Sequence, residues 1–382
     1  MNQDSSAPES LPHLLEVFRK TPQRVLDPGK GILIFGAGNF AEALGRVLLR
    51  RGFQVRGFIE TEPRLREKIG LPVRSWEALV AEDFSSELLL GIFNRGMPLD
   101  ELKAIAIGHG FEAPWMPFEV YDLIGEDLGW RFWLSPRSNF LNQQELILQG
   151  FDLLEDEESR SNFLRICAFR LGLDDSFAGV RNEIPQYFNE LTLPHGSELD
   201  LCFVDCGAYT GDTYRYLQSA NVRINSAYLF EPDPQNYHAL IASIEKPSHP
   251  VVCLPLGVSG RYEILRFNSG EGEGASLGME GDTQIAVVSL DGLLKGVPVD
   301  FLKMDIEGAE HAALKGAAQL IALNRPTLAI SLYHRQEDLW LLPILVKSLH
   351  PGYKIYIRQH AFNSFETVLY AVDDGRFTRT SA

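Results

Sequence analysis

Residues 201–213, LCFVDCGAYTGDT, decide how the second half of the chain folds. The stretch opens with four apolar residues, and a short apolar run that stops at an acidic residue is typical of a buried parallel strand. Asp205 ends the run, and Gly207 and Gly211 follow before helical sequence resumes at Asp212. This order of strand, carboxylate, glycine-rich turn and helix predicts a small-molecule site at the carboxyl end of a parallel strand.

The next expected strand, residues 227–230, supports this prediction because it also ends at a carboxylate. Glu231 and Pro232 follow it, and 24 positions separate Gly207 from Glu231. A carboxylate so placed can accept hydrogen bonds from both hydroxyls of a ribose. Asp205 and Asp212 would repel a phosphate, so we expect a nucleoside ligand without phosphates that carries positive charge. S-adenosylmethionine fits this description.

Length and composition exclude several classes of protein. A chain of 382 residues predicts two or three domains. Its net charge of −16 argues against nucleic acid or an anionic membrane surface as a partner. No apolar run approaches about 20 residues, so no membrane insertion is expected. The polar N-terminus resembles neither a signal peptide nor a transit peptide, and the four cysteines form no CxxC pair, so we expect reduced thiols in a cytoplasmic protein.

The first half of the chain contains a second strand–glycine–helix unit. A strand at 32–35 leads into Gly36-Ala37-Gly38-Asn39-Phe40-Ala41, and the strand at 55–59 ends at Glu60, 22 positions after Gly38. This spacing meets the local criteria for a dinucleotide-binding unit, in which Gly36, Gly38 and Asn39 would bind a nucleotide and Glu60 would bind its ribose. Residues 32–60 resemble part of the small N-terminal Rossmann-like domain of bacterial sugar acyltransferases. The alternative is a docking or homodimerisation domain whose glycines serve only packing.

We predict four segments along the chain. They are a tail and short helix at 1–20, a Rossmann-like domain at 21–125, an aromatic and helical connector at 126–198, and a second α/β domain at 199–382. Pro194-His195-Gly196 is the expected hinge into that domain. The acidic run at 155–158 is predicted to be the solvated start of a helix.

The second α/β domain is predicted to be doubly wound. Further strands are expected at 251–256, 284–290, 299–304 and 327–332, and helices at 310–323 and 337–349. The closing strands at 353–358 and 366–372 are joined by a short loop, which predicts an antiparallel hairpin at one edge of the sheet. A mainly parallel sheet closed by such a hairpin is the fold of class I methyltransferases.

Five stretches of this domain resemble the FkbM family of S-adenosylmethionine-dependent methyltransferases. They are VDCGAYTGDT (204–213), FEPDP (230–234), SLD (289–291), LKMDIEGAEHAALKGA (302–317) and ISLYHRQEDLW (330–340). The resemblance covers about residues 186–372. One departure is Arg358-Gln359-His360, where we expect a histidine directly after the arginine, and this bears on the choice of acceptor.

The resemblance implies where the methyl donor binds. Asp205, Gly207 and Gly211 would line its methionine portion, Glu231 would hold the ribose, and Val258 or Ser259 would lie near adenine. The complete set of donor-binding residues that we predict is Asp205, Gly207, Tyr209, Gly211, Asp212, Thr213, Glu231, Pro232, Val258, Ser259 and Asp305. Helix capping is the alternative role for Asp205 and Glu231.

Methyl transfer to a hydroxyl of a sugar, glycan precursor or related small molecule is the expected reaction, and it calls for a positioned base. We predict His334 as that base, with Asp305 and Glu307 as further catalytic residues and no resident metal. The alternative is a divalent metal on Asp305 and Glu307 that lowers the pKa of the hydroxyl. Glu310 is otherwise expected to favour the N-terminus of its helix, and Lys303 to neutralise a neighbour.

Two other functions compete with this one through the first domain. The Gly36 turn is also compatible with an NAD-dependent oxidoreductase or a nucleotide-sugar-binding module. The first domain contains no Tyr-x-x-x-Lys pair, which counts against hydride transfer. The DCGAYTGDT and KMDIEGAE runs of the second domain are intact, which counts against a binding module whose catalytic domain has decayed.

Overall fold

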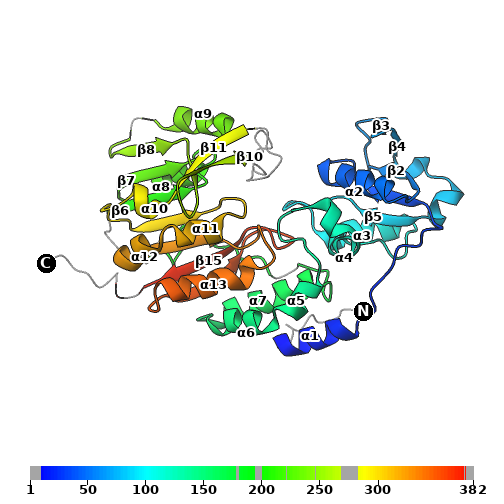
Figure 1. The fold of residues 1–382 in the computed structure, drawn as a ribbon. Helices are drawn as coiled ribbons and strands as arrows, with labels where there is room; N and C mark the ends of the chain where they lie inside the picture. Colours follow the sequence, from blue (N-terminus) through cyan, green and yellow to red (C-terminus); the bar gives the residue numbers. More distant parts are fainter. Residues whose placement is uncertain are drawn as a thin grey trace. The chain divides into compact units, whose positions relative to one another are not determined.

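The computed structural model describes residues 10–177, 180–193, 200–220, 222–245, 247–267, 283–373 and 375, which form two compact units (Figure 1). Unit 1 comprises Met1–Glu145, Ser161–Asn182 and Ala361–Phe365, and unit 2 comprises Leu146–Arg160, Glu183–His360 and Glu366–Ala382. The expected connector at 126–198 is therefore not a separate segment, because its residues are shared between the two units. The expected hinge at 194–196 lies outside the described residues.

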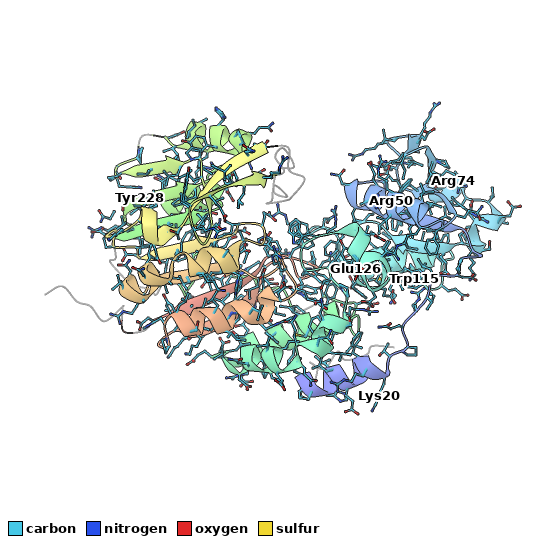
Figure 2. All side chains as sticks on the ribbon, in the orientation of Figure 1. Lys20, Arg50, Arg74, Trp115, Glu126 and Tyr228 are labelled. Atoms are coloured by element: carbon cyan, nitrogen blue, oxygen red, sulfur yellow. The ribbon has the colours of Figure 1, made fainter. Side chains whose placement is uncertain are left out.

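Unit 1 is built on a five-stranded sheet in the order β3-β4-β2-β1-β5. Its strands are β1 (Ile32–Phe35), β2 (Val55–Ile59), β3 (Glu67–Lys68), β4 (Leu71–Arg74) and β5 (Glu87–Leu90). The pairs β1–β2, β1–β5 and β2–β4 are parallel, and β3 is antiparallel to β4. Trp115, labelled in Figure 2, lies beside β5 at one edge of this sheet. It forms a parallel bridge to Leu89, and its indole N–H donates to Glu87 at 2.8 Å.

The helices of the first half of the chain follow the expected alternation. They are α1 (Leu11–Lys20), α2 (Asn39–Arg50), η1 (Trp76–Ala78), η2 (Ala81–Ser85), α3 (Leu99–Gly108), α4 (Pro117–Leu128), α5 (Ser138–Asn142), α6 (Gln144–Asp152) and α7 (Glu157–Arg170). The turn between β1 and α2 requires glycine, because Gly36 has φ +111° and a Cβ there would lie 2.6 Å from Ile92. The predicted strand, glycine turn and helix are therefore confirmed.

Unit 2 contains a seven-stranded sheet in the order β14-β15-β13-β12-β6-β7-β8 (Figure 1). The strands are β6 (Leu201–Cys206), β7 (Ile224–Phe230), β8 (Val251–Leu254), β12 (Phe301–Met304), β13 (Thr327–Ser331), β14 (Lys354–Gln359) and β15 (Thr367–Val372). All neighbours are parallel except at β15, which is antiparallel to both β13 and β14. Numbered along the chain and read from β8, the order is 3-2-1-4-5-7-6. This α/β arrangement, with its predicted terminal hairpin, is the class I methyltransferase fold.

The remaining elements of unit 2 surround this sheet. The helices are α8 (Asp212–Ser219), α9 (Pro234–Ser243), α10 (Leu290–Leu293), α11 (Glu310–Lys315), α12 (Ala318–Asn324) and α13 (Asp338–Leu349). A second sheet, β10-β11-β9, is formed by β9 (Gly257–Val258), β10 (Glu263–Phe267) and β11 (Thr283–Val288). Within the described part of the chain, no helix combines the length and apolar character needed to cross a membrane.

One expectation about this unit was wrong, and another was incomplete. The single helix at 310–323 is two helices, α11 and α12, because the chain turns at Gly316, where a Cβ would lie only 2.3 Å from the Ser259 carbonyl oxygen. The acidic run at 155–158 is mainly exposed and leads into α7, as expected, but it also binds an arginine. Arg358, whose side chain is 5% exposed, pairs with Asp156 at 2.6 Å and with Glu158 at 3.0 Å. Both outcomes depend on tertiary contacts.

Candidate active site

The carboxyl end of β6 is the point where the strand order of the sheet reverses. Later strands in the chain, β12 and β13, lie on one side of β6, and β7 and β8 lie on the other. In open α/β sheets, ligands bind in the crevice outside such a switch point. The residues expected to carry chemistry lie at or near the carboxyl ends of these strands. Asp205 is on β6, Glu231 follows β7, Asp305 follows β12, and His334 lies shortly after β13.

Asp205 is paired inside the sheet with Lys303 on the neighbouring strand. The Lys303 ammonium lies 2.8 Å from Asp205 Oδ1 and donates at the same distance to the Gly207 carbonyl oxygen. Both side chains are buried, at 0% and 3% exposure. Burial raises the pKa of Asp205 to about 6, although Lys303 opposes the shift. The expected neutralising role of Lys303 is confirmed, and Asp205 supports the glycine turn through it.

The glycine turn after β6 passes directly against the backbone that follows β12. Gly207 has φ +85°, and a Cβ there would lie 1.9 Å from the Asp305 carbonyl oxygen, so only glycine fits. Gly211, with φ +82°, is the N-cap of α8. Tyr209 lies between the two glycines with φ +47°, a backbone conformation that is uncommon for a residue with a side chain. At the start of α8, Asp212 is exposed and Thr213 is buried.

Glu231 ties this turn to the end of β7. Its Oε2 accepts a hydrogen bond from the Tyr209 N–H at 2.8 Å, and its Oε1 accepts one from the Asp233 N–H at 2.9 Å. Asp233, rather than Glu231, caps α9 by accepting from the amides of Gln235 and Asn236. Burial raises the pKa of Glu231 to about 7, although the hydrogen bonds from the Asp233 and Tyr209 amides act to lower it. Each carboxylate oxygen has a second lone pair, so further hydrogen bonds to a ribose are possible.

The residues expected near adenine belong to β9 or follow it directly, and β9 approaches the end of β7. A Cβ on Gly257 would lie 3.8 Å from the Pro232 ring, which places β9 against the end of β7. Val258 and Ser259 are both buried, and the Ser259 N–H donates to the Val288 carbonyl oxygen. The short second sheet thus holds one side of the predicted donor site.

The structure brings the four residues Asp305, Glu307, Glu310 and His334 together as a carboxylate–histidine cluster. His334 Nδ1 lies 2.7 Å from Glu310 Oε1, while Nε2 lies 3.3 Å from Asp305 Oδ1 and 3.4 Å from Glu307 Oε2. His334 and Glu310 are fully buried, but the side chains of Asp305 and Glu307 are 22% and 16% exposed. One ligand atom each from Asp305, Glu310 and His334 lies within 4.8 Å of the others.

Burial and the neighbouring charges together shift the pKa values of His334, Glu307 and Asp305. Burial alone would lower the pKa of His334, but the carboxylates of Glu310, Glu307 and Asp305 raise it well above its ordinary value. Burial raises the pKa of Glu307 to about 8, with His334 opposing. Burial also acts to raise the pKa of Asp305, but His334 and Lys303 outweigh it and lower that pKa. The neighbouring carboxylates therefore favour the charged form of His334.

Comparison with known proteins agrees with this geometry. Residues 205–372 match the family model described as the methyltransferase FkbM domain. This region is an FkbM methyltransferase domain. A crystal structure of methyltransferase FkbM from Methylobacillus flagellatus KT superposes with a TM-score of 0.69 at 22% identity, covering 90% of this chain and 90% of that chain. At that identity the likeness shows the fold alone. No curated protein sequence matches the chain significantly.

Sequence reasoning missed several side chains of unit 2 that lie at or near this cluster. Tyr187 donates from its hydroxyl to Asp305 Oδ2 at 3.0 Å, and Tyr333 donates to Asp305 Oδ1 at 3.2 Å. Gln186 contacts Tyr187 and donates to Glu366 Oε2 at 2.5 Å. Tyr187 and Asp305 are 118 positions apart. No local pattern pairs them, so only the fold could show the contact.

The glycine turn of unit 1 has the layout expected for a nucleotide site. Gly38 and Asn39 are exposed at the start of α2, and a Cβ on Gly38 would meet no atom within 4 Å. Glu60 follows the adjacent strand, and its Oε2 accepts from the Arg64 N–H at 3.2 Å. The family match begins at residue 205 and does not test the resemblance of residues 32–60 to sugar acyltransferases. Nucleotide binding at this turn therefore stays a prediction.

Proposed function

We propose that this protein is an S-adenosylmethionine-dependent O-methyltransferase that acts on a hydroxyl of a sugar, glycan precursor or related small molecule. The observation that supports it best is the arrangement at the end of β6. There the Gly207 turn, bound to Glu231 through Tyr209, lies against Asp305, whose carboxylate belongs to the carboxylate–histidine cluster.

Glu231 and the Gly207 turn form the donor half of the proposed site. Glu231 accepts the ribose hydroxyls, and the glycine turn lets the backbone approach the methionine portion. Pro232, Val258 and Ser259 would hold adenine. Asp305 would attract the sulfonium, since a carboxylate attracts a cation. The methyl group passes directly from sulfur to the acceptor oxygen, so the main contribution of the protein is positioning, which can supply about 7–11 kcal/mol.

Proton removal is assigned to the carboxylate–histidine cluster, with His334 as the proton acceptor. An imidazolium cannot accept a proton, and the three carboxylates favour that form in the protein alone. A cation arriving beside Asp305 weakens their field and lowers the pKa of His334, so the neutral imidazole becomes available when the sulfonium is bound. His334 Nε2, which faces Asp305 and Glu307, would then take the proton of the hydroxyl.

The experiment that tests this function uses the full chain and labelled S-adenosylmethionine. Titration calorimetry with this donor, NAD and UDP-sugars should show binding of the donor, and incubation with candidate glycans should give methylated product. Absence of donor binding would overturn the proposal. NAD reduction in the presence of any substrate, abolished by Gly38→Trp, would favour the oxidoreductase instead.

A further inference from the structure

We propose that Tyr187 and Tyr333 are positioning residues that hold Asp305 as an oriented anion. In this role Asp305 is the counter-ion of the donor sulfonium before methyl transfer and of the His334 imidazolium after it. The inference rests on the proposed function, because that function supplies the cation beside Asp305 at each stage. It also means that Asp305 does not accept the proton of the hydroxyl.

Both carboxylate oxygens of Asp305 accept hydrogen bonds from tyrosine hydroxyls. Asp305 follows β12 and Tyr333 lies shortly after the neighbouring strand β13, whereas Tyr187 comes from the segment before β6. Tyr187 donates to Oδ2 at 3.0 Å, and Tyr333 donates to Oδ1 at 3.2 Å. Hydrogen bonds to an ionised carboxylate favour the ionised form, and two donors on different oxygens also fix its orientation. The Asp305 side chain is still 22% exposed, so a ligand can approach it.

The surroundings of Tyr187 make its hydroxyl a donor to Asp305. Gln186 Nε2 donates to the Tyr187 hydroxyl oxygen at 3.0 Å and to Glu366 Oε2 at 2.5 Å. An amide nitrogen can only donate, so the hydroxyl accepts from Gln186 and directs its own hydrogen at Asp305. Hydrogen bonds in such a chain strengthen one another. The Lys303 ammonium lies 5.2 Å from the centre of the Tyr187 ring, and this cation–π contact helps to hold the ring in place.

The ionisation of these groups matches this direction of the hydrogen bonds. Burial and the Asp305 carboxylate raise the phenol pKa of Tyr187 and of Tyr333 well above the ordinary value, so both tyrosines keep their proton. Burial also acts to raise the pKa of Asp305, but His334 and Lys303 outweigh it, and the Tyr187 hydrogen bond adds to their effect. The phenols therefore donate to an ionised carboxylate, and neither of them is a base.

Methyl transfer moves a positive charge between two neighbours of Asp305. The bond from the methyl carbon to sulfur breaks and its electron pair stays on sulfur, so the sulfonium becomes a neutral thioether. The acceptor oxygen bonds to the methyl carbon, and its proton passes to His334, which becomes an imidazolium. His334 Nε2 lies 3.3 Å from Asp305 Oδ1. An Asp305 that stays ionised therefore has a cation beside it in both states, which a protonated Asp305 could not stabilise.

This arrangement predicts that the site distinguishes the donor from its product by charge. S-adenosylmethionine carries the sulfonium, whereas S-adenosylhomocysteine lacks both the methyl group and this charge. The attraction to Asp305 therefore applies to the donor alone. A change that weakens or disorients the Asp305 charge should reduce donor affinity and spare product affinity. A hydroxyl that only stabilised the fold would affect both ligands alike.

Titration calorimetry on the full chain with S-adenosylmethionine and S-adenosylhomocysteine measures this selectivity. Tyr187→Phe and Tyr333→Phe each remove one hydroxyl and keep the ring, and we expect each to weaken donor binding about three- to tenfold. Asp305→Asn removes the charge at nearly constant shape and should weaken donor binding about 10- to 100-fold. Affinity for S-adenosylhomocysteine should stay nearly unchanged in all three variants. Tyr216→Phe, which removes the hydroxyl of an exposed tyrosine on α8, should change neither affinity.

Two results would overturn the positioning role, provided that circular dichroism shows folded variants. They are wild-type affinity for both ligands in the two tyrosine variants, and losses of equal size for donor and product. Failure of the wild-type chain to bind either ligand would instead reject the methyltransferase proposal, and this inference with it. Donor binding by the wild type, with a loss in the variants that is confined to the donor, would support both.

Discussion

His334 Nδ1 lies 2.7 Å from Glu310 Oε1, and both side chains are completely buried although 24 positions separate them in the chain. The contact fixes the orientation of the imidazole, because Glu310 Oε1 is itself bound to the Ile306 N–H at 2.9 Å. Nε2 is consequently directed at Asp305 and Glu307. As the proposed proton acceptor, His334 lies where the acceptor hydroxyl is expected.

Replacing His334 should impair turnover far more than donor binding. We expect His334→Ala to lower kcat by ~10²–10⁴, because the group that activates the hydroxyl is lost, while calorimetry shows nearly unchanged affinity for S-adenosylmethionine. His238→Ala, which removes an exposed histidine on α9, is the matched control. Wild-type turnover in a folded His334→Ala protein would exclude this residue from catalysis.

Glu231→Ala should weaken donor binding. The substitution removes the proposed charge-assisted contact to the ribose, so the loss should be about 1.5–3 kcal/mol of binding free energy in a calorimetric titration with S-adenosylmethionine. Because Glu231 also holds the Tyr209 and Asp233 amides, thermal unfolding must confirm that the variant is folded. Glu245→Ala serves as the control. Unchanged donor affinity would reject Glu231 as the ribose ligand.

Nucleoside binding should depend on pH near neutrality. The pKa of Glu231 is raised to about 7 by burial, so the carboxylate is ionised above that pH and protonated below it. Only the ionised form accepts hydrogen bonds at both oxygens, and affinity should therefore fall by up to about tenfold for each pH unit below 7. The probe is 5′-methylthioadenosine, which lacks the amino-acid portion of S-adenosylmethionine and therefore its titrating α-amino group. A flat profile for the wild type, equal to that of Glu231→Gln, would contradict the assignment.

Gly207→Ala should destabilise unit 2 more than Gly296→Ala, although both substitutions replace a glycine with a similar positive φ. Gly207 and Gly296 have similar φ values, +85° and +81°, but only at Gly207 would a Cβ collide, 1.9 Å from the Asp305 carbonyl oxygen. We expect the free energy of unfolding to fall by about 2–5 kcal/mol for Gly207→Ala and by about 1–2 kcal/mol for Gly296→Ala in urea titrations. Equal losses would mean that the turn can move away from Asp305.

The sequence alone was enough to predict the strands and to show which strand ends carry candidate site residues. Apolar runs that stop at Asp205, Glu231 and Asp305 predicted three parallel strands with their carboxylates at one edge, because strand periodicity and turn residues are local signals. The terminal hairpin was likewise predicted from two strands and a short loop. A helix break that depends on tertiary contacts was not predictable from the sequence. The expected helix at 310–323 is divided at Gly316, where the chain packs against Ser259.

Only the tertiary structure decided which partners these residues have. Lys303 contacts Asp205, 98 positions away in the chain, because the parallel sheet places β6 beside β12. Tyr187 contacts Asp305, 118 positions away, because the segment that contains Tyr187 folds as part of unit 2. Burial then sets the charge states, since removing Glu231 and Glu307 from water raises both carboxyl pKa values. Local sequence determines which side chains end each strand. The dielectric surroundings and long-range contacts that make them a candidate site exist only after folding.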